Sequence, residues 1–401
     1  MPTAPSRPAN PERRPGSRAK GVPPFLGLLD PVTLKERGDF EFDCALAHDD
    51  VAATWKWILR DLAADLIDEK ALDESERSRA AVEALMPDLI GRAQLALDAA
   101  AKSPEAGRRL TSQVGGEETR DRLPYVLAAM RCRSLFEKAQ GFGRAANGLT
   151  DDSSLTLALQ SLVASDQNAT PFLMFAMVGQ MAQPMRLLSA AIRSAGEATE
   201  PALIRTGFGP LIDAILAHAQ DQIPVLTQVG TFGDMDLICR AVDRYHRLMR
   251  AVIGLIELTR GNDWARIAAT LTKHVSDKLD PKLRDVAPDV NKSLRKRDGT
   301  DRLDSDQVLS ALNGMYLLAT IRDCRDSLAL NNLFDQVWSQ VGQALEIHID
   351  RLLDALRAKP NDNVASARLD AALKMAAIRF GQDYADTLRR AKETTVRRLS
   401  S

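Results

Sequence analysis

The stretch from Asp234 to Arg260 constrains the fold of this 401-residue chain more than any other. Apolar residues recur there at steps of three and four, which places them on one face of a helix of about seven turns. Asp234 stands where an N-cap belongs, and Gly261 follows as a left-handed C-terminal residue would. The apolar stripe consists of Met235, Ile238, Ala241, Val242, Tyr245, Met249, Val252 and Ile256. Further leucines and isoleucines widen the stripe, so we expect this helix to be the central rod of a helical protein.

The same periodicity recurs along most of the chain. Further helices are predicted over residues 49–70, 75–101, 121–142, 151–163, 170–196, 200–224, 263–279, 305–328, 331–356 and 369–388. We find no stretch that alternates apolar and polar residues and is also rich in β-branched side chains, as a strand would be. The sequence therefore predicts an all-α fold, either a multi-helix antiparallel bundle or a stacked helical array.

Composition divides the chain into four predicted parts. Residues 1–24 hold seven of the 19 prolines and five basic residues against one acid, with almost nothing apolar to bury, which predicts a disordered basic tail. A helical domain is predicted over residues 25–280, with an optional inner boundary near 103–120, where proline and glycine interrupt the pattern. A polar basic linker is predicted over residues 281–304, followed by a C-terminal helical bundle segment over 305–401.

Composition also limits the functional classes. The formal net charge is −1, so bulk charge does not indicate a nucleic-acid or membrane binder. The apolar run over residues 171–185 is too short and too interrupted to span a bilayer, and the N-terminus has no apolar signal core. The four cysteines are widely separated, as free thiols in a reducing compartment would be; they are Cys44, Cys132, Cys239 and Cys324. We therefore expect a cytoplasmic protein without a transmembrane segment.

An acidic run near residue 61 suggests a metal-dependent helical enzyme. Asp61 and Asp65 lie one turn apart, as aspartate pairs that hold magnesium do, and Asp323 and Asp326 are candidate partners on another helix. However, Leu62 and Leu66 mark the core face of the first helix, so the aspartates lie beside or away from it. A solvated acidic face is the interpretation that this pattern favours.

Two other patterns are weighed in the same way. Asp243 and His246 lie three residues apart on the central helix, as half of a carboxylate–histidine metal site would. No matching group is evident on a facing helix, so a hydrogen-bonded histidine at the edge of the core is favoured. The methionines of the 170–196 helix are more typical of core than of an adaptable binding surface. They are Met174, Met177, Met181 and Met185.

The common catalytic signatures are absent from the sequence. There is no phosphate-binding loop, dinucleotide fingerprint, nucleophile elbow or zinc-protease motif. We therefore assign no catalytic, cofactor-binding or metal-binding residue, and we expect no cofactor. The basic cluster over residues 292–297 has no interleaved aromatic residues, so it is only a weak nucleic-acid signal.

These observations favour an intracellular interaction or scaffold protein that presents helix surfaces to protein partners. Two alternatives remain open at this point. One is a helical subunit or gatekeeper of a secretion machine, with residues 1–24 as its signal. The other is a helical metal-dependent enzyme that uses the aspartates near Asp61 and Asp323. Nothing in the sequence predicts the oligomeric state.

Overall fold

The computed structural model describes residues 24–68, 72, 75–165, 167–227, 234–259, 261–296 and 302–397. Nearly all of their regular structure is helical, which confirms the predicted all-α class. Contacts divide the chain into two units: unit 1 is Met1–Asp30 with Asp49–Arg133, and unit 2 is Pro31–His48 with Ser134–Ser401. Apart from Pro24, the predicted disordered tail lies outside the described residues.

Unit 1 is a small group of helices built around α3. Its elements are α1 (Pro24–Leu29), α2 (His48–Trp57, whose first residue belongs to unit 2), the π-helix η2 (Ile58–Leu62), α3 (Glu76–Lys102), α4 (Pro104–Val114) and α5 (Glu117–Cys132). The Ser75 hydroxyl accepts the main-chain N–H of Ser78 and caps α3 at the predicted start. Helix α4 occupies most of the predicted inner boundary, and α3 packs against α1, α4 and α5.

The first part of unit 2 surrounds one very apolar helix. Its elements are η4 (Arg133–Leu135, whose first residue belongs to unit 1), α6 (Phe136–Ala146), α7 (Asp152–Ser165), α8 (Thr170–Val178), α9 (Pro184–Ala195), α10 (Glu200–Arg205), α11 (Gly209–Gln220), α12 (Ile223–Leu226) and α13 (Met235–Leu255). Helix α8 packs against α6 and α11 and has buried residues on every side. The single methionine-rich helix that we expected is divided into α8 and α9. Its methionines are buried except for Met185, so they belong to the core.

Helix α13 begins where the sequence predicts and ends earlier. The Asp234 carboxylate accepts the main-chain N–H of Leu237, which confirms the N-cap. The helix ends at Leu255 rather than at Arg260, because the Glu257 N–H leaves the helical ladder and donates to the Ala198 carbonyl at 2.9 Å. Gly261 does have a positive φ of 96°, but it lies in the turn before α14.

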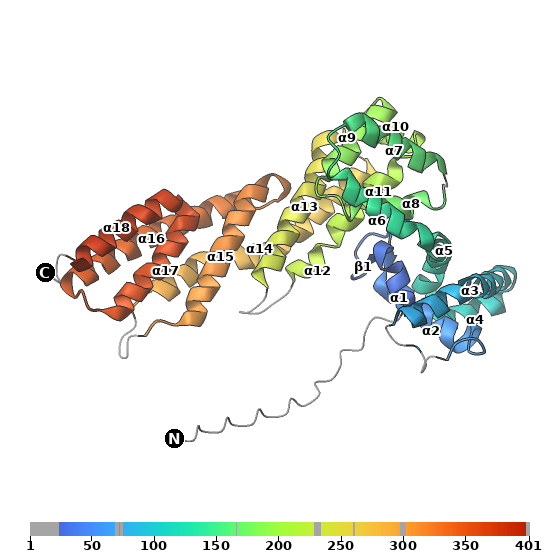
Figure 1. Cartoon of the computed structure of the whole chain (residues 1–401), viewed down its shortest axis with the longest axis horizontal. Helices are drawn as coiled ribbons and strands as arrows, with labels where there is room; N and C mark the ends of the chain where they lie inside the picture. The colour runs from blue at the N-terminus through green and yellow to red at the C-terminus, as the bar shows by residue number, and fades with distance from the viewer. Residues whose placement is uncertain are drawn as a thin grey trace, which may run out of the picture. The chain divides into compact units, whose positions relative to one another are not determined.

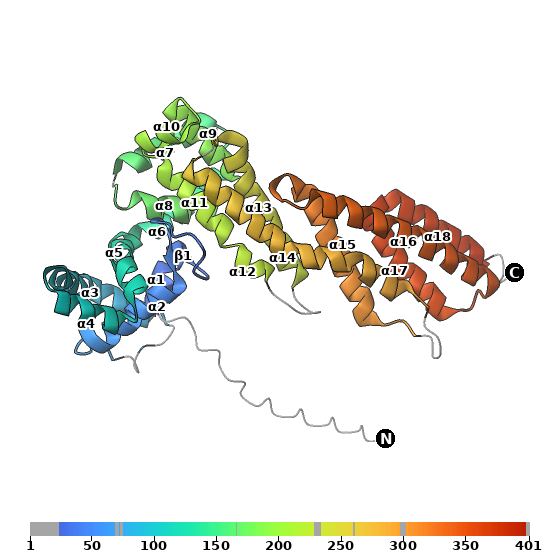
Figure 2. The same ribbon diagram turned by 180° about the vertical axis from the view of Figure 1, so that it is seen from behind.

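Helix α14 (Asp263–Leu294) joins the two parts of unit 2. Figures 1 and 2 show it running from α11–α13 toward the remaining elements, which are α15 (Ser305–Cys324), η5 (Arg325–Ser327), α16 (Asn331–Ala358), α17 (Asn363–Phe380) and α18 (Gln382–Arg397). Much of the predicted linker over residues 281–304 is therefore helix. Pro281 and Pro288 lie within α14, where buried Leu279, Leu283 and Val286 keep the apolar stripe unbroken and outweigh the lost hydrogen bonds.

An irregular segment near the N-terminus belongs to unit 2. The 3-10 turn η1 (Asp30–Val32) leads into β1 (Thr33–Leu34), which pairs in parallel with β2 (Leu46–Ala47), so the expectation of no strand is wrong by one short pair. Buried Leu34, Phe42 and Cys44 anchor this segment in the core. We call residues 35–45, between the two strands, the strap. Its tip, residues 35–41, lies against α11 and α14.

Candidate functional site

The strap is held at its tip by a buried glutamine at the end of α11. The Phe40 main-chain N–H donates to Gln220 Oε1 at 3.0 Å, and Gln220 Nε2 donates to the Phe40 carbonyl at 2.9 Å. Gln220 is only 4% exposed. Burying an amide is unfavourable unless its hydrogen bonds are satisfied. The α11 end is therefore built to grip the main chain of an extended segment.

The next residue of the chain makes a second grip. The Lys35 main-chain N–H donates to Asp221 Oδ1 at 2.9 Å, and Lys35 Nζ lies 3.4 Å from Asp221 Oδ2. Burial raises the pKa of the Asp221 carboxyl, and these contacts with Lys35 oppose the shift. Asp221 and Gln220 together hold the strap at two main-chain positions.

Side chains of the strap tip are also contacted individually. His274 Nδ1 of α14 lies 2.7 Å from Asp39 Oδ2, which makes an ion pair when the imidazole is protonated. The Arg266 guanidinium lies over the Phe40 ring at 5.5 Å from its centroid. A Cβ atom on Gly38 would lie 2.1 Å from Gln220 Cδ, so only glycine fits there without moving the amide.

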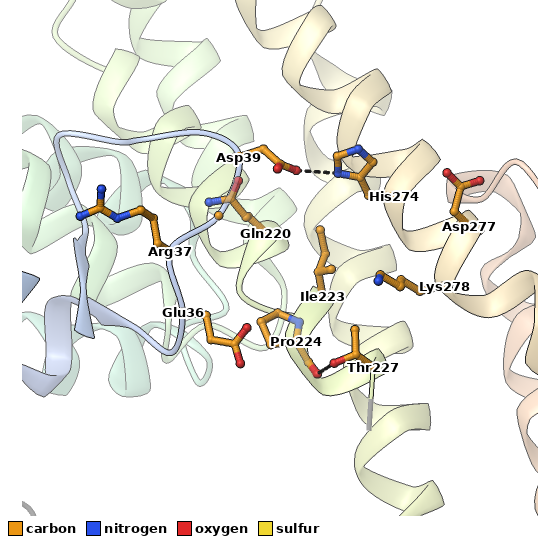
Figure 3. Close-up of a pocket in the computed structure, with 11 residues that line it drawn as sticks. Glu36, Arg37, Asp39, Gln220, Ile223, Pro224, Thr227, His274, Asp277 and Lys278 are labelled. Atoms are coloured by element: carbon orange, nitrogen blue, oxygen red, sulfur yellow. Dashed lines mark hydrogen bonds and ion pairs between the residues drawn. The ribbon is translucent and has the colours of Figure 1, made fainter. Parts of the chain in front are cut away.

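An open groove of about 490 Å³ lies beside the strap tip. Figure 3 shows the strap residues on one side, with α11, α12 and α14 supplying the other walls. Glu36, Asp277 and Lys278 line the groove, and their side chains make no ion pair or hydrogen bond with another described residue. Ile223 and Pro224 add an apolar strip. Such a groove presents main-chain, charged and apolar contacts side by side.

An acidic group lies elsewhere between α11 and α14. The Asp213 carboxylate accepts a hydrogen bond from Trp264 Nε1 at 2.9 Å. Burial raises the pKa of Asp213 to about 6, and the nearby charges of Asp43 and Glu200 add to the shift. Within the described part of the chain, no three His, Cys, Asp or Glu side chains are grouped as a metal ion requires.

Replacing Asp213 with asparagine is expected to stabilise the protein by about 1 to 2 kcal/mol at pH 8. Asparagine keeps an oxygen for Trp264 Nε1 and removes a charge that burial disfavours. The folded-state pKa lies above the unfolded one, so the charge destabilises the fold as pH rises through about 4 to 6, and the gain should nearly vanish at pH 4. Urea unfolding at both pH values measures it, and an equal effect at both would contradict the assignment.

The aspartates of the metal hypothesis are bound by arginines. Asp61 pairs with Arg60 at 2.6 Å. The Asp65 carboxylate accepts hydrogen bonds from both Nη atoms of Arg92, and these bonds lower the pKa of Asp65. These residues belong to unit 1. Their candidate partners belong to unit 2, where Asp323 pairs with Arg322 at 2.9 Å and Asp326 lies 3.9 Å from Arg250.

The structure also places Asp243 and His246 with separate partners. Asp243 forms an ion pair with Arg247 at 2.7 Å, whereas His246 Nδ1 lies 3.0 Å from the Ser327 hydroxyl of η5. Burial and the charge of Arg250 lower the pKa of His246. The hydrogen-bonded edge histidine that the sequence favours is the state observed.

Comparison with known proteins adds no family to these observations. No family model, no curated protein and no solved structure matches the chain. In the part of the chain that the structure describes, no helix combines the length and the apolar character needed to cross a bilayer.

Sequence reasoning did not identify the strap contacts, because Phe40 and Gln220 lie 180 residues apart and form no local motif. The only available signal was the irregular, glycine-containing segment before the first long helix.

Proposed function

We propose that this chain is a non-enzymatic interaction protein, and that it holds an extended segment of a protein partner along α11 and α14, at the position of the strap tip and in the groove beside it. The observation that carries the proposal is the buried Gln220 amide, which pairs with both main-chain groups of Phe40. Main-chain hydrogen bonds provide affinity for an extended segment of any sequence, and neighbouring side chains then provide specificity. The Asp277 and Lys278 side chains of α14, which pair with no other described residue, are available for that second role.

The rigid helical walls support the same proposal. Helix α14 contacts α11, α12, α15, α16 and α17, so its groove-facing residues are held in place from both ends. A groove that does not have to form on binding loses less conformational entropy when it captures a segment. The secretion hypothesis depends on residues 1–24, which lie outside the described residues except for Pro24, and it stays a prediction.

The proposal is tested by exchanging charges in the groove. A double variant, Asp277→Lys with Lys278→Glu, keeps the net charge and places each sign where the other was. We expect affinity capture from nuclease-treated lysate of the native cells to recover partners at least about tenfold less with this variant, because a misplaced charge at a desolvated contact costs more than about 1.4 kcal/mol.

A matched control exchanges charges elsewhere in unit 2. Asp354 and Arg357 form an exposed ion pair on α16, with side chains 72% and 61% exposed. The variant Asp354→Lys with Arg357→Glu also keeps the net charge and should leave capture unchanged. Equal recovery of the same partners by the wild type and the groove variant would refute the proposal.

A further inference from the structure

We infer that the strap tip occupies the position where the partner segment binds, and that the partner segment carries the same types of residue as the tip. The inferred partner segment is an extended peptide with a glycine, an acid and an aromatic residue in succession, as in Gly38, Asp39 and Phe40. This inference rests on the proposed function and makes it specific. It assigns the wall residues of α11 and α14 as the contacts for those three positions.

We call Gly38, Asp39 and Phe40 the template, and each of these three residues is contacted by a side chain of α11 or α14. The Gln220 amide leaves no room for a Cβ at Gly38, so it selects glycine. His274 lies 2.7 Å from the Asp39 carboxylate, and the Arg266 guanidinium lies over the Phe40 ring. The same Gln220 amide grips the main chain at Phe40, which requires the segment to be extended there.

The strap tip can leave without unfolding its base. Residues 35, 36, 39 and 41 are exposed, and polar contacts of Lys35, Asp39 and Phe40 and the cation–π contact of Phe40 with Arg266 hold the tip. The base is anchored separately, by buried Leu34, Phe42 and Cys44 and by the pairing of β1 with β2. Segments with few buried apolar contacts open locally at much lower free energy than the core. A partner segment can therefore replace the tip while the rest of unit 2 stays folded.

The variant Gly38→Ala is designed to release the strap tip from α11 and α14. Its Cβ forces the Gln220 amide aside and breaks both hydrogen bonds to Phe40. Losing two hydrogen bonds raises the open fraction of the tip on the order of 30-fold. Hydrogen exchange at the Phe40 and Lys35 amides should accelerate by the same factor. Gly254→Ala in α13 is the matched control, because nothing lies within 4 Å of its Cβ position.

The binding test uses the strap's own sequence as the probe. A fluorescent peptide of residues 33–43 is titrated into the wild type, Gly38→Ala and Gly254→Ala by fluorescence anisotropy. In the wild type the attached strap competes, so the apparent Kd is raised by the small fraction of open molecules. We expect Gly38→Ala to bind the peptide on the order of 30-fold more tightly than the wild type and Gly254→Ala. Peptides that are scrambled or carry alanine at position 38 should not bind.

A second variant protects the test against misfolding. Phe40→Ala loosens the tip from the strap side alone, and circular dichroism checks that each variant is folded. Adding Gln220→Ala to Gly38→Ala should abolish peptide binding. The inference is overturned if the peptide binds none of the folded variants, or if the scrambled peptide binds equally well. The groove charge exchange could abolish partner capture while the strap peptide binds none of the variants. That combination would overturn the inference that the strap tip resembles the partner, and it would leave the proposed function standing.

Discussion

Replacing Arg244 with alanine is expected to lower the free energy of unfolding by about 3 kcal/mol. The guanidinium of Arg244 on α13 donates to the carbonyl of Val178 at 2.7 Å and to the carbonyl of Met181. These carbonyls lie at and just beyond the C-terminal end of α8, where a helix leaves acceptors unsatisfied. Burial lowers the pKa of Arg244 to about 10, which still leaves it charged at neutral pH. Alanine would leave both carbonyls without this donor and remove the packed stem.

Arg247, less than one turn further along α13, provides the control for this variant. It forms an ion pair with Asp243, and its side chain is 48% exposed. Arg247→Ala should change stability by less than about 0.5 kcal/mol, as exposed pairs do. Chemical unfolding followed by circular dichroism measures both variants. Equal losses for the two would show that Arg244 is not a specific cap of α8.

Lowering the pH from about 7 to about 4 is expected to destabilise unit 2 through His218 by about 2 kcal/mol, after discounting for the part of the residue that solvent reaches. His218 Nε2 lies 2.8 Å from the Phe175 carbonyl, and its ring stacks on the Phe175 ring at 3.9 Å. Burial lowers the pKa of His218 from 6.5 to about 4. Between these values the unfolded chain binds the proton and the folded chain does not. The contribution of His218 to the free energy of unfolding is therefore complete above about pH 6.5 and is lost as the pH falls toward 4.

Comparison with His218→Gln isolates this contribution. Asp213 acts with the opposite sign over an overlapping range of pH, so the slope for the wild type alone is not diagnostic. Glutamine does not titrate there, and the difference in unfolding free energy between the two proteins should shrink by about 2 kcal/mol between pH 7 and pH 4. A constant difference across that range would contradict the assignment.

Local signals predicted the helices well. Asp234 acts as the N-cap that its position indicated, and Ser75, at the predicted start of its helix, caps α3, because capping depends on residues only three positions apart. The predictions failed where a distant contact competes with a local preference. Helix α13 ends at Leu255 because Glu257 finds the carbonyl of Ala198, and α14 continues through Pro281 because buried side chains on both sides hold it.

The candidate site was not predictable by the same means. Gln220 has no local feature that distinguishes it from an exposed glutamine at a helix end, and Gly38 resembles any loop glycine. Their roles arise only because the strap returns to α11 across 180 residues of chain. His274 appeared in the sequence as an isolated histidine, and its partner Asp39 lies in a segment without periodicity. Patterns of period 3.6 carry no information about such contacts.

The interleaving of the two units along the chain sets an order of events during synthesis. The strap leaves the ribosome before any of unit 1 after Asp30, yet its anchor Gln220 follows 180 residues later. At ordinary elongation rates of about 5 to 20 residues per second, this delay is on the order of 10 to 40 s. Unit 1 is complete by Arg133 and can fold within that interval. The strap is thus made with the first segment of unit 2, but it stays without its anchor on α11 until Gln220 has been synthesised.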